Sequence, residues 1–209
     1  MNYRKTLLDA HETHYGGRDI LNWTDPRSVI TPKMEHDDMA YSISGMFQAA
    51  TILCGLDLPL SELATMTLCD VGCGTGKVTR ALQMFVRRAV GWDPKPECIA
   101  AARAETARCP LKSARWPPLF CDELPDEAYD LIVCTDVMPG LGLRKADAIC
   151  ETFGRLAAPG ALLVANIRNF REPTITAMLT ERGFSLVGPI RPCNPDALAC
   201  YGFYLWSHA

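Results

Sequence analysis

The sequence of 209 residues has no apolar run approaching ~18 residues, the length that a membrane-spanning helix needs. Its first residues, Met1 to Thr6, lead into charged residues rather than into the apolar core of a secretory signal, so we expect a cytoplasmic protein. Repeats and low-complexity segments are absent too. These absences favour one ordinary globular domain, and the length suits one α/β domain with an appendage.

No pair of cysteines has C-x-x-C spacing, although the chain contains ten cysteines. Single cysteines predict neither a zinc site nor a disulfide framework, and inside strands and helices they act as small apolar residues. His36, Asp37 and Asp38 are consecutive, and adjacent residues do not share a helix face. We therefore expect no metal.

A strongly basic surface is also lacking, since the formal net charge is −3. The first sixty residues carry that charge, with five Lys and Arg against eight Asp and Glu, while the remainder is balanced at sixteen of each. An acidic N-terminal segment is a poor landing surface for nucleic acid.

One stretch, residues 66–80, combines an apolar run, an acid, three glycines and the start of a helix. Gly72, Gly74 and Gly76 let a ligand lie against the backbone of a tight turn between strand and helix. The free N–H groups at the helix start favour a carboxylate, and Asp70 offers a negative charge to an ammonium group. An amino acid carries both of these charges.

The spacing of these glycines excludes two phosphate-binding motifs. A dinucleotide fingerprint needs glycine one place later, where Lys77 stands, and a P-loop needs glycine at Val71 and Ser or Thr at Val78. A second apolar segment ends in Asp93, seventeen residues after Gly76. In a βαβ unit an acid there reaches the ribose hydroxyls of a nucleoside. The two segments together predict a ligand that joins an amino acid to a nucleoside.

The segments 68–76 and 90–103 resemble the first two motifs of the Rossmann-like (class I) S-adenosylmethionine-dependent methyltransferases, and the similarity runs from about Leu63 to the C-terminus. The resemblance implies S-adenosyl-L-methionine as cofactor and an α/β three-layer sandwich. The expected sheet has seven strands and is mostly parallel, with an antiparallel last strand. An N-terminal helical lid is expected in addition to this core.

Alternating patterns predict the elements of this fold. Strands are expected over 66–70, 88–93, 119–121, 129–135, 161–166, 184–187 and 200–206. Helices are expected over 2–14, 35–54, 77–87, 96–108, 144–156 and 174–182, with a turn over 157–160. The short link 191–199 predicts antiparallel pairing of the last two strands. We divide the chain into a lid, residues 1–60, and a cofactor-binding core, residues 61–209. The lid's second helix is expected to carry an apolar stripe of Met39, Ile43, Met46, Phe47, Ala50 and Leu53.

The predicted cofactor site lies beyond the carboxyl ends of the strands. Its residues are Tyr15, Asp70, Gly72, Cys73, Gly74, Gly76, Asp93, Pro94, Asp122, Glu123 and Thr135. The resemblance implies that Asp122 or Glu123, or a backbone amide beside them, meets the adenine.

The catalytic candidates are His36, a base suited to neutral pH, and Asp136, which follows strand four where family members often carry an acid. The alternative for Asp136 is a loop acid that shapes the cofactor site. For substrate binding we select Tyr41, Arg168 and Arg171, because a guanidinium suits a carboxylate or phosphate.

The function predicted from these features is N- or O-methylation of a small-molecule metabolite, without nucleic-acid or membrane partners. Two alternatives stay open. One is methylation of protein or RNA, supported by arginines such as Arg87, Arg88 and Arg103; the other is a catalytically silent cofactor-binding subunit.

Overall fold

The computed structural model describes residues 38–108, 117–190 and 201–209. The predicted helix over 2–14 and the link 191–199 lie outside these residues. The chain divides into two compact units, residues 1–44 and 45–209, and the description below concerns the second. Among the described helices none is long and apolar enough to cross a membrane.

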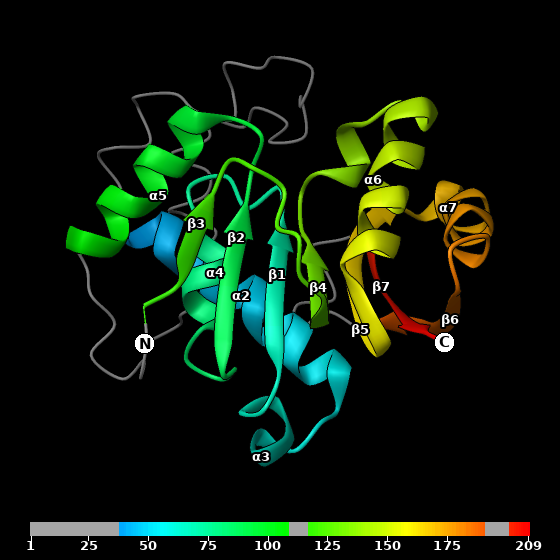
Figure 1. Ribbon diagram of the computed structural model, residues 1–209, viewed down its shortest axis with the longest axis horizontal. Helices are drawn as coiled ribbons and strands as arrows, with labels where there is room; N and C mark the ends of the chain where they lie inside the picture. The colour runs from blue at the N-terminus through cyan, green and yellow to red at the C-terminus, as the bar shows by residue number, and fades with distance from the viewer. Residues whose placement is uncertain (1–37, 109–116, 191–200) are drawn as a thin grey trace, which may run out of the picture. The chain divides into compact units, whose positions relative to one another are not determined.

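The described elements alternate between helices and strands along the chain (Figure 1). The helices are α2 (Asp38–Leu56), α3 (Leu60–Leu63), α4 (Lys77–Leu82), α5 (Pro96–Arg108), η2 (Met138–Gly140), α6 (Leu143–Leu156), η3 (Asn169–Arg171) and α7 (Glu172–Thr180). The strands are β1 (Thr67–Val71), β2 (Arg88–Trp92), β3 (Leu119–Cys121), β4 (Tyr129–Cys134), β5 (Ala157–Arg168), β6 (Phe184–Ile190) and β7 (Tyr201–His208).

The strands form one sheet in the order β3-β2-β1-β4-β5-β7-β6. β1 to β5 pair in parallel, whereas β7 is antiparallel to both β5 and β6. The predicted fold is thus confirmed, including the antiparallel last strand. The order reverses at β1, whose neighbours are β2 and β4, so the crevice that binds ligands in such sheets lies at the end of β1.

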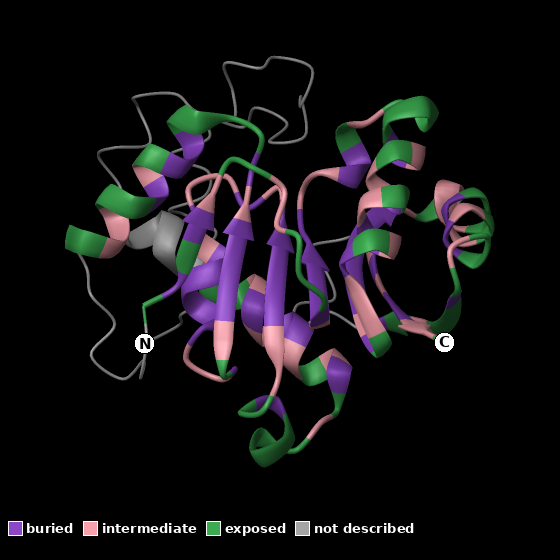
Figure 2. Ribbon diagram, in the orientation of Figure 1, coloured by how far each residue is buried: buried purple, intermediate pink, exposed green. Residues whose placement is uncertain are grey.

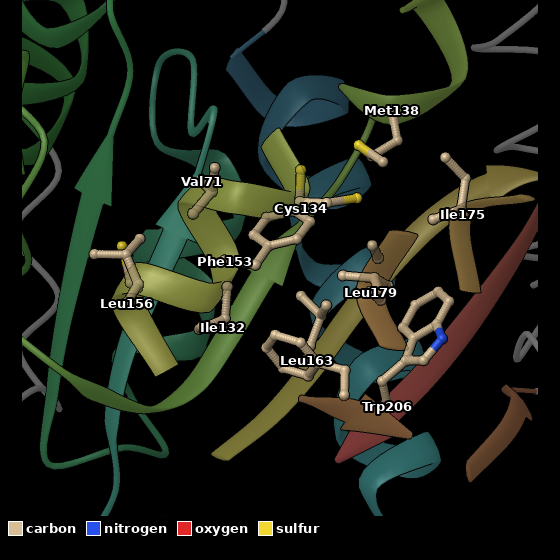
Figure 3. Packing of buried hydrophobic residues seen from close by; sticks show 14 of the residues in the cluster. Val71, Ile132, Cys134, Met138, Phe153, Leu156, Leu163, Ile175, Leu179 and Trp206 are labelled. Atoms are coloured by element: carbon tan, nitrogen blue, oxygen red, sulfur yellow. The ribbon is translucent and has the colours of Figure 1, made fainter. Parts of the chain in front are cut away.

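Both faces of the sheet are covered, which is why its strands read as continuous apolar runs (Figure 2). Successive residues of β4 point to opposite faces: Ile132 packs with α6 and α7, and Leu131 packs with α2 and α4. Figure 3 shows the first of these clusters, in which Phe153 and Trp206 are completely buried. The central strands are therefore held rigidly, and so are the residues that follow them.

Several elements differ in length from the prediction, and α4 and β5 differ most. α4 ends at Leu82 instead of Arg87, because the N–H of Phe85 turns back to the carbonyl of Leu82 and the side-chain oxygen of Gln83 accepts from the N–H of Ala89 at 2.7 Å. Conversely, β5 starts at Ala157 and absorbs the turn predicted over 157–160. Gly160 keeps a positive φ of 75° inside that strand, which explains why its pattern resembles a turn.

The stripe predicted for α2 is wrong for Met46 and Phe47, whereas Leu53 packs against the core. Met46 and Phe47 are 52% and 45% exposed, whereas Ala49, Ile52 and Leu56 are buried in the core. The buried face combines small and large apolar residues, and the sequence pattern did not single it out because Met46 and Phe47 are apolar as well but lie outward. The second half of α2 therefore packs in the core, and it falls within the compact unit that begins at Gly45.

Candidate functional site

The turn after β1 is built around three glycines in left-handed conformations. The φ angles of Gly72, Gly74 and Gly76 are 75°, 55° and 77°. A Cβ at Gly72 would lie 2.4 Å from a methyl carbon of Val137, and one at Gly76 would lie 2.5 Å from the ring of Phe120. A Cβ at Gly74 would meet no atom of the described residues within 4 Å. The turn is tightly packed on two sides and open at its centre.

Asp70 lies in β1 between β2 and β4 and is 1% exposed. One carboxylate oxygen accepts from the hydroxyl of Thr79 at 2.6 Å, and the other is buried without a hydrogen-bond donor among the described residues. Burial raises the pKa of Asp70 to about 6, because the charged form has lost its water, while the bonds from Thr79 oppose this rise. The carboxyl group is suited to meet a cation that arrives with a ligand.

Asp93 follows β2 directly and holds the glycine turn in place. One carboxylate oxygen accepts from the N–H of Gly74 at 3.0 Å, and the other accepts from the N–H of Lys95 at 3.0 Å. The carbonyl of Trp92, one residue earlier, accepts from the N–H groups of Gly72 and Cys73. Each oxygen of Asp93 still has a lone pair for a further donor.

The segment after β3 is tied to β2. The indole N–H of Trp92 donates to the carbonyl of Asp122 at 3.3 Å, and the N–H of Asp93 donates to the carbonyl of Cys121 at 3.2 Å. The side chains of Asp122 and Glu123 are exposed. The ends of β1, β2 and β3 therefore meet through backbone contacts.

Asp136, beyond the end of β4, lies at the centre of a second polar cluster. Its φ angle is 63°, an uncommon conformation for a residue with a side chain. One carboxylate oxygen accepts from the amide of Asn166 at 2.8 Å, and the other accepts from the amide of Gln48 at 2.6 Å and lies 3.8 Å from the ammonium of Lys77. The side-chain oxygen of Asn166 accepts from the N–H of Asp136 at 2.6 Å.

Four other predicted residues lie near these acids or near the ends of the strands. The side chain of Cys73 packs against Ile99 and Phe120, so only its backbone can face a ligand. Thr135 is buried beside Asp136, and Pro94 is exposed beside Asp93. Arg171 donates to the carbonyl of Leu141, which ties η3 to the segment before α6.

The side chains of three further predicted residues, Tyr15, His36 and Tyr41, are not described by the structure. Tyr15 and His36 lie outside the described residues, and of Tyr41 only the helical backbone is described. Arg168 is the last residue of β5 and is partly exposed. No group of three His, Cys, Asp or Glu that could hold a metal ion occurs within the described ranges.

The structure adds residues that the sequence did not indicate. Thr79, in α4, donates a hydrogen bond that orients Asp70 nine residues earlier. The sequence alone does not predict this contact, because it depends on the geometry of the turn between β1 and α4. Gln48 and Asn166 lie 88 and 30 residues from Asp136, so no local pattern connects them.

Comparison with known proteins assigns these features to a family. Residues 69–163, which include both acids and the glycine turn, match the family model described as "Methyltransferase domain". The chain contains a methyltransferase domain. This confirms the family that the two motifs predicted, and the match ends within β5, beyond Asp136.

Curated proteins similar to this methyltransferase domain include the ribosomal protein L11 methyltransferase of Azotobacter vinelandii, 34% identical over 116 residues. That alignment covers 54% of this chain and 39% of the relative. The enzyme of the same name from Pseudomonas paraeruginosa is 36% identical over 114 residues, which are 54% of this chain and 37% of the relative. The chain thus spans about two fifths of the length of these relatives.

Solved structures share the fold. Magnesium protoporphyrin IX methyltransferase from Synechocystis with bound S-adenosylmethionine has a TM-score of 0.66 at 16% identity, and the match covers 96% of each chain. The N-methyltransferase NodS from Bradyrhizobium japonicum has a TM-score of 0.59 at 20% identity, over 82% of this chain and 98% of that one. At such identities the likeness concerns the fold.

The curated relatives correct one prediction. A small-molecule partner was expected from the acidic N-terminal segment and from the lack of basic patches, but the similar curated enzymes are named for a ribosomal protein. Net charge was a misleading guide, because a protein substrate presents no dense phosphate charge and does not need a basic surface.

Proposed function

We propose that this protein is a methyltransferase that transfers a methyl group from S-adenosyl-L-methionine to a protein. The observation that carries the proposal is the buried oxygen of Asp70, which has no donor among the described residues and lies at the end of β1 beside an open glycine turn. Neither feature stabilises the ligand-free fold. Both suit a ligand with an ammonium group.

The amino-acid part of the cofactor fits the turn. Its ammonium group would donate to the free oxygen of Asp70, whose other oxygen is held by Thr79. The absence of a side chain at Gly74 leaves room for the ligand against the backbone, since a Cβ there would have no atom of the described part of the chain within 4 Å.

The nucleoside part fits Asp93. Two hydrogen bonds from backbone N–H groups fix its carboxylate, and the remaining lone pairs can accept from the two ribose hydroxyls. The adenine would lie toward Asp122, whose backbone is fixed by the indole of Trp92, and we assign the adenine contact to this backbone rather than to the exposed carboxylates.

When bound, the cofactor supplies a methyl group on a positively charged sulfur. A lone pair of the acceptor atom forms the new bond to the methyl carbon, and the electrons of the broken carbon–sulfur bond stay on sulfur. The chain has to align the acceptor and receive its proton, directly or through water. Asp136 suits this task, since its carboxylate is 27% exposed and each oxygen can accept one more hydrogen bond.

A protein acceptor is supported by the curated relatives, which are named as methyltransferases of ribosomal protein L11. Their additional length lies outside the matched region, so the segments with which they recognise their substrate are not implied here. We therefore propose the substrate class, a protein, and not a particular protein.

The experiment is methyl transfer from S-adenosylmethionine labelled in the methyl group. The acceptors are purified ribosomal protein L11, the total ribosomal proteins and a deproteinised metabolite extract, all from one bacterial source. We expect label in a protein band, abolished by Asp93→Ala. Label in the metabolite extract alone would refute the protein substrate, and failure of the chain to bind the cofactor would refute the enzyme itself.

A further inference from the structure

Gln48 joins helix α2 to the carboxylate of Asp136 across 88 residues of sequence. Its side-chain nitrogen donates to a carboxylate oxygen of Asp136 at 2.6 Å, a short distance for a hydrogen bond to a charged acceptor. Charge-assisted bonds of this length are stronger than neutral ones. Gln48 is therefore a strong restraint on the orientation of Asp136.

The orientation of the Gln48 amide follows from its neighbour. A carboxylate only accepts, so the group facing it has to be the NH₂ of Gln48 and not its carbonyl oxygen. That oxygen is buried and receives no hydrogen bond among the described residues. The side chain thus satisfies the carboxylate and leaves its own acceptor unsatisfied, which a residue with a purely structural role would avoid.

Asp136 itself has an unfavourable backbone conformation. A residue with a side chain at a φ of 63° is strained, and such residues persist where surrounding contacts fix them, often at functional sites. Asn166 fixes the backbone N–H and one oxygen, and Gln48 fixes the other oxygen. Three hydrogen bonds with two distant elements hold this one residue, two through its side chain and one through its backbone N–H.

The position of α2 is fixed one turn before Gln48. A Cβ at Gly45 would lie 2.8 Å from the carbonyl oxygen of Lys77, so the helix approaches the start of α4 as closely as only glycine permits. Lys77 in turn lies 3.8 Å from Asp136. Gly45 and Gln48 therefore set α2 against the end of the glycine turn and against Asp136 together.

We propose that Gln48 is a positioning residue for methyl transfer, which holds the Asp136 carboxylate toward the methyl acceptor and makes α2 a part of the acceptor side of the site. This rests on the proposed function. Gln48 acts through Asp136 and does not contact the cofactor, so its loss reduces turnover without weakening cofactor binding.

The test compares Gln48→Ala and Gln48→Glu with the wild-type chain. Dissociation constants for S-adenosylhomocysteine come from calorimetry, and kcat and KM come from transfer of labelled methyl groups to the ribosomal proteins. Loss of one bond to a charged group predicts a fall in kcat of roughly ten-fold or more, with the dissociation constant unchanged within about two-fold. Gln48→Glu keeps the shape but places a second carboxylate beside Asp136, and we expect at least the same fall.

Gln83→Ala is the matched control. Gln83 is a buried glutamine whose side-chain oxygen accepts from the N–H of Ala89, far along α4 from the glycine turn. Its removal should lower the melting temperature and leave kcat unchanged. If kcat falls more in Gln48→Ala than in Gln83→Ala at equal folded fraction, the difference is attributed to the lost contact between Gln48 and Asp136.

The outcomes separate the two proposals. Wild-type kcat in both Gln48 variants overturns the role of Gln48 and leaves the proposed function intact, and so does an equal loss in Gln83→Ala. A wild-type chain that binds S-adenosylhomocysteine but labels no acceptor overturns the proposed function and, with it, this role.

Discussion

Asp70 shows how a single buried side chain can be prepared for a ligand. Its carboxyl group is almost completely buried, and burial raises its pKa to about 6, with the charge of Asp93 adding to the rise. The bond from Thr79 satisfies one oxygen, and the other has no donor among the described residues. The charged carboxyl group of Asp70 thus destabilises the ligand-free protein, and an ammonium group of a ligand would stabilise it.

The first prediction is that cofactor affinity depends on pH through Asp70. Below a pKa of about 6 the carboxyl group is protonated and loses its attraction for an ammonium group. We expect affinity for S-adenosylhomocysteine to fall about ten-fold between pH 7.5 and pH 5, measured by calorimetry. Asp70→Asn should bind weakly at both pH values, and a wild type with constant affinity over this range would contradict the role of Asp70.

The second prediction concerns stability of the ligand-free protein. Because the folded-state pKa of Asp70 lies above the ordinary pKa of an aspartate, its contribution to stability is full below the unfolded pKa and is lost as the pH rises through about 6. Asp70→Asn should therefore raise the free energy of unfolding at pH 7.5, by up to roughly 3 kcal/mol, and by much less at pH 4. Urea denaturation at both pH values measures this, and destabilisation at pH 7.5 would be the contrary result.

The third prediction concerns Asp93. Asp93→Ala removes the proposed acceptor of the ribose hydroxyls and should weaken cofactor binding by roughly 1.5–3 kcal/mol in calorimetry. Asp130→Ala is the control, because Asp130 accepts from the N–H and the hydroxyl of Thr67 at the opposite end of β1. If both variants bind S-adenosylhomocysteine equally well, Asp93 does not belong to the site.

Among the elements, the turn between β1 and α4 contains glycines with two different roles, some in packing and one in the proposed ligand binding. Gly72 approaches Val137 and Gly76 approaches Phe120, so these glycines are needed for close packing as well as for their positive φ angles. Gly74 has the same kind of backbone without any protein neighbour within 4 Å of a Cβ. Its openness is the feature that a ligand would use.

The fourth prediction follows from this difference. Gly72→Ala should lower the melting temperature strongly, since its methyl group overlaps Val137. Gly74→Ala carries only the backbone cost of about 1–2 kcal/mol and should fold, but its methyl group occupies the proposed ligand space and should weaken cofactor binding. Thermal unfolding and calorimetry on both variants check this, and normal binding by folded Gly74→Ala would argue against the turn as the site.

The sequence predicted the elements well where local pattern determines them. β3 and α5 have the predicted bounds, because an apolar run and a proline at the helix start are local signals. The buried face of α2 was predicted only in part, since apolar residues lie on both its buried and its exposed side. The positions of Asp70 and Asp93 could be predicted because both lie at the ends of apolar strands. The contact of Gln48 with Asp136 could not be predicted, because it depends on the three-dimensional arrangement of α2 and β4.

For the whole molecule, residues 45–209 contain a complete α/β core. Both faces of the sheet are covered by described helices, and the second half of α2 completes the face opposite α6 and α7. The proposed cofactor contacts of Asp70, Gly74 and Asp93 all come from this unit. Folding and cofactor binding should therefore not need the residues before α2.

The last prediction is that the N-terminal lid, expected from the sequence over residues 1–60, acts in turnover through residues 1–37, and this remains our proposal. The loop between the two predicted helices, residues 15–34, contains Gly16, Gly17, Pro26, Pro32 and capping residues, a composition found in segments that order when a ligand binds. Closure would exclude water from the sulfonium group and bring Tyr15 or His36 toward the acceptor. Deleting residues 1–37 keeps all of α2 and should leave a folded protein that binds S-adenosylhomocysteine, measured by calorimetry, but has lost transfer to the ribosomal proteins. In the intact chain, S-adenosylhomocysteine should slow tryptic cleavage at Arg18 and Arg27 in a time course followed by mass spectrometry. A truncated protein with full turnover would refute the lid, and an insoluble one would place residues 1–37 in the fold instead.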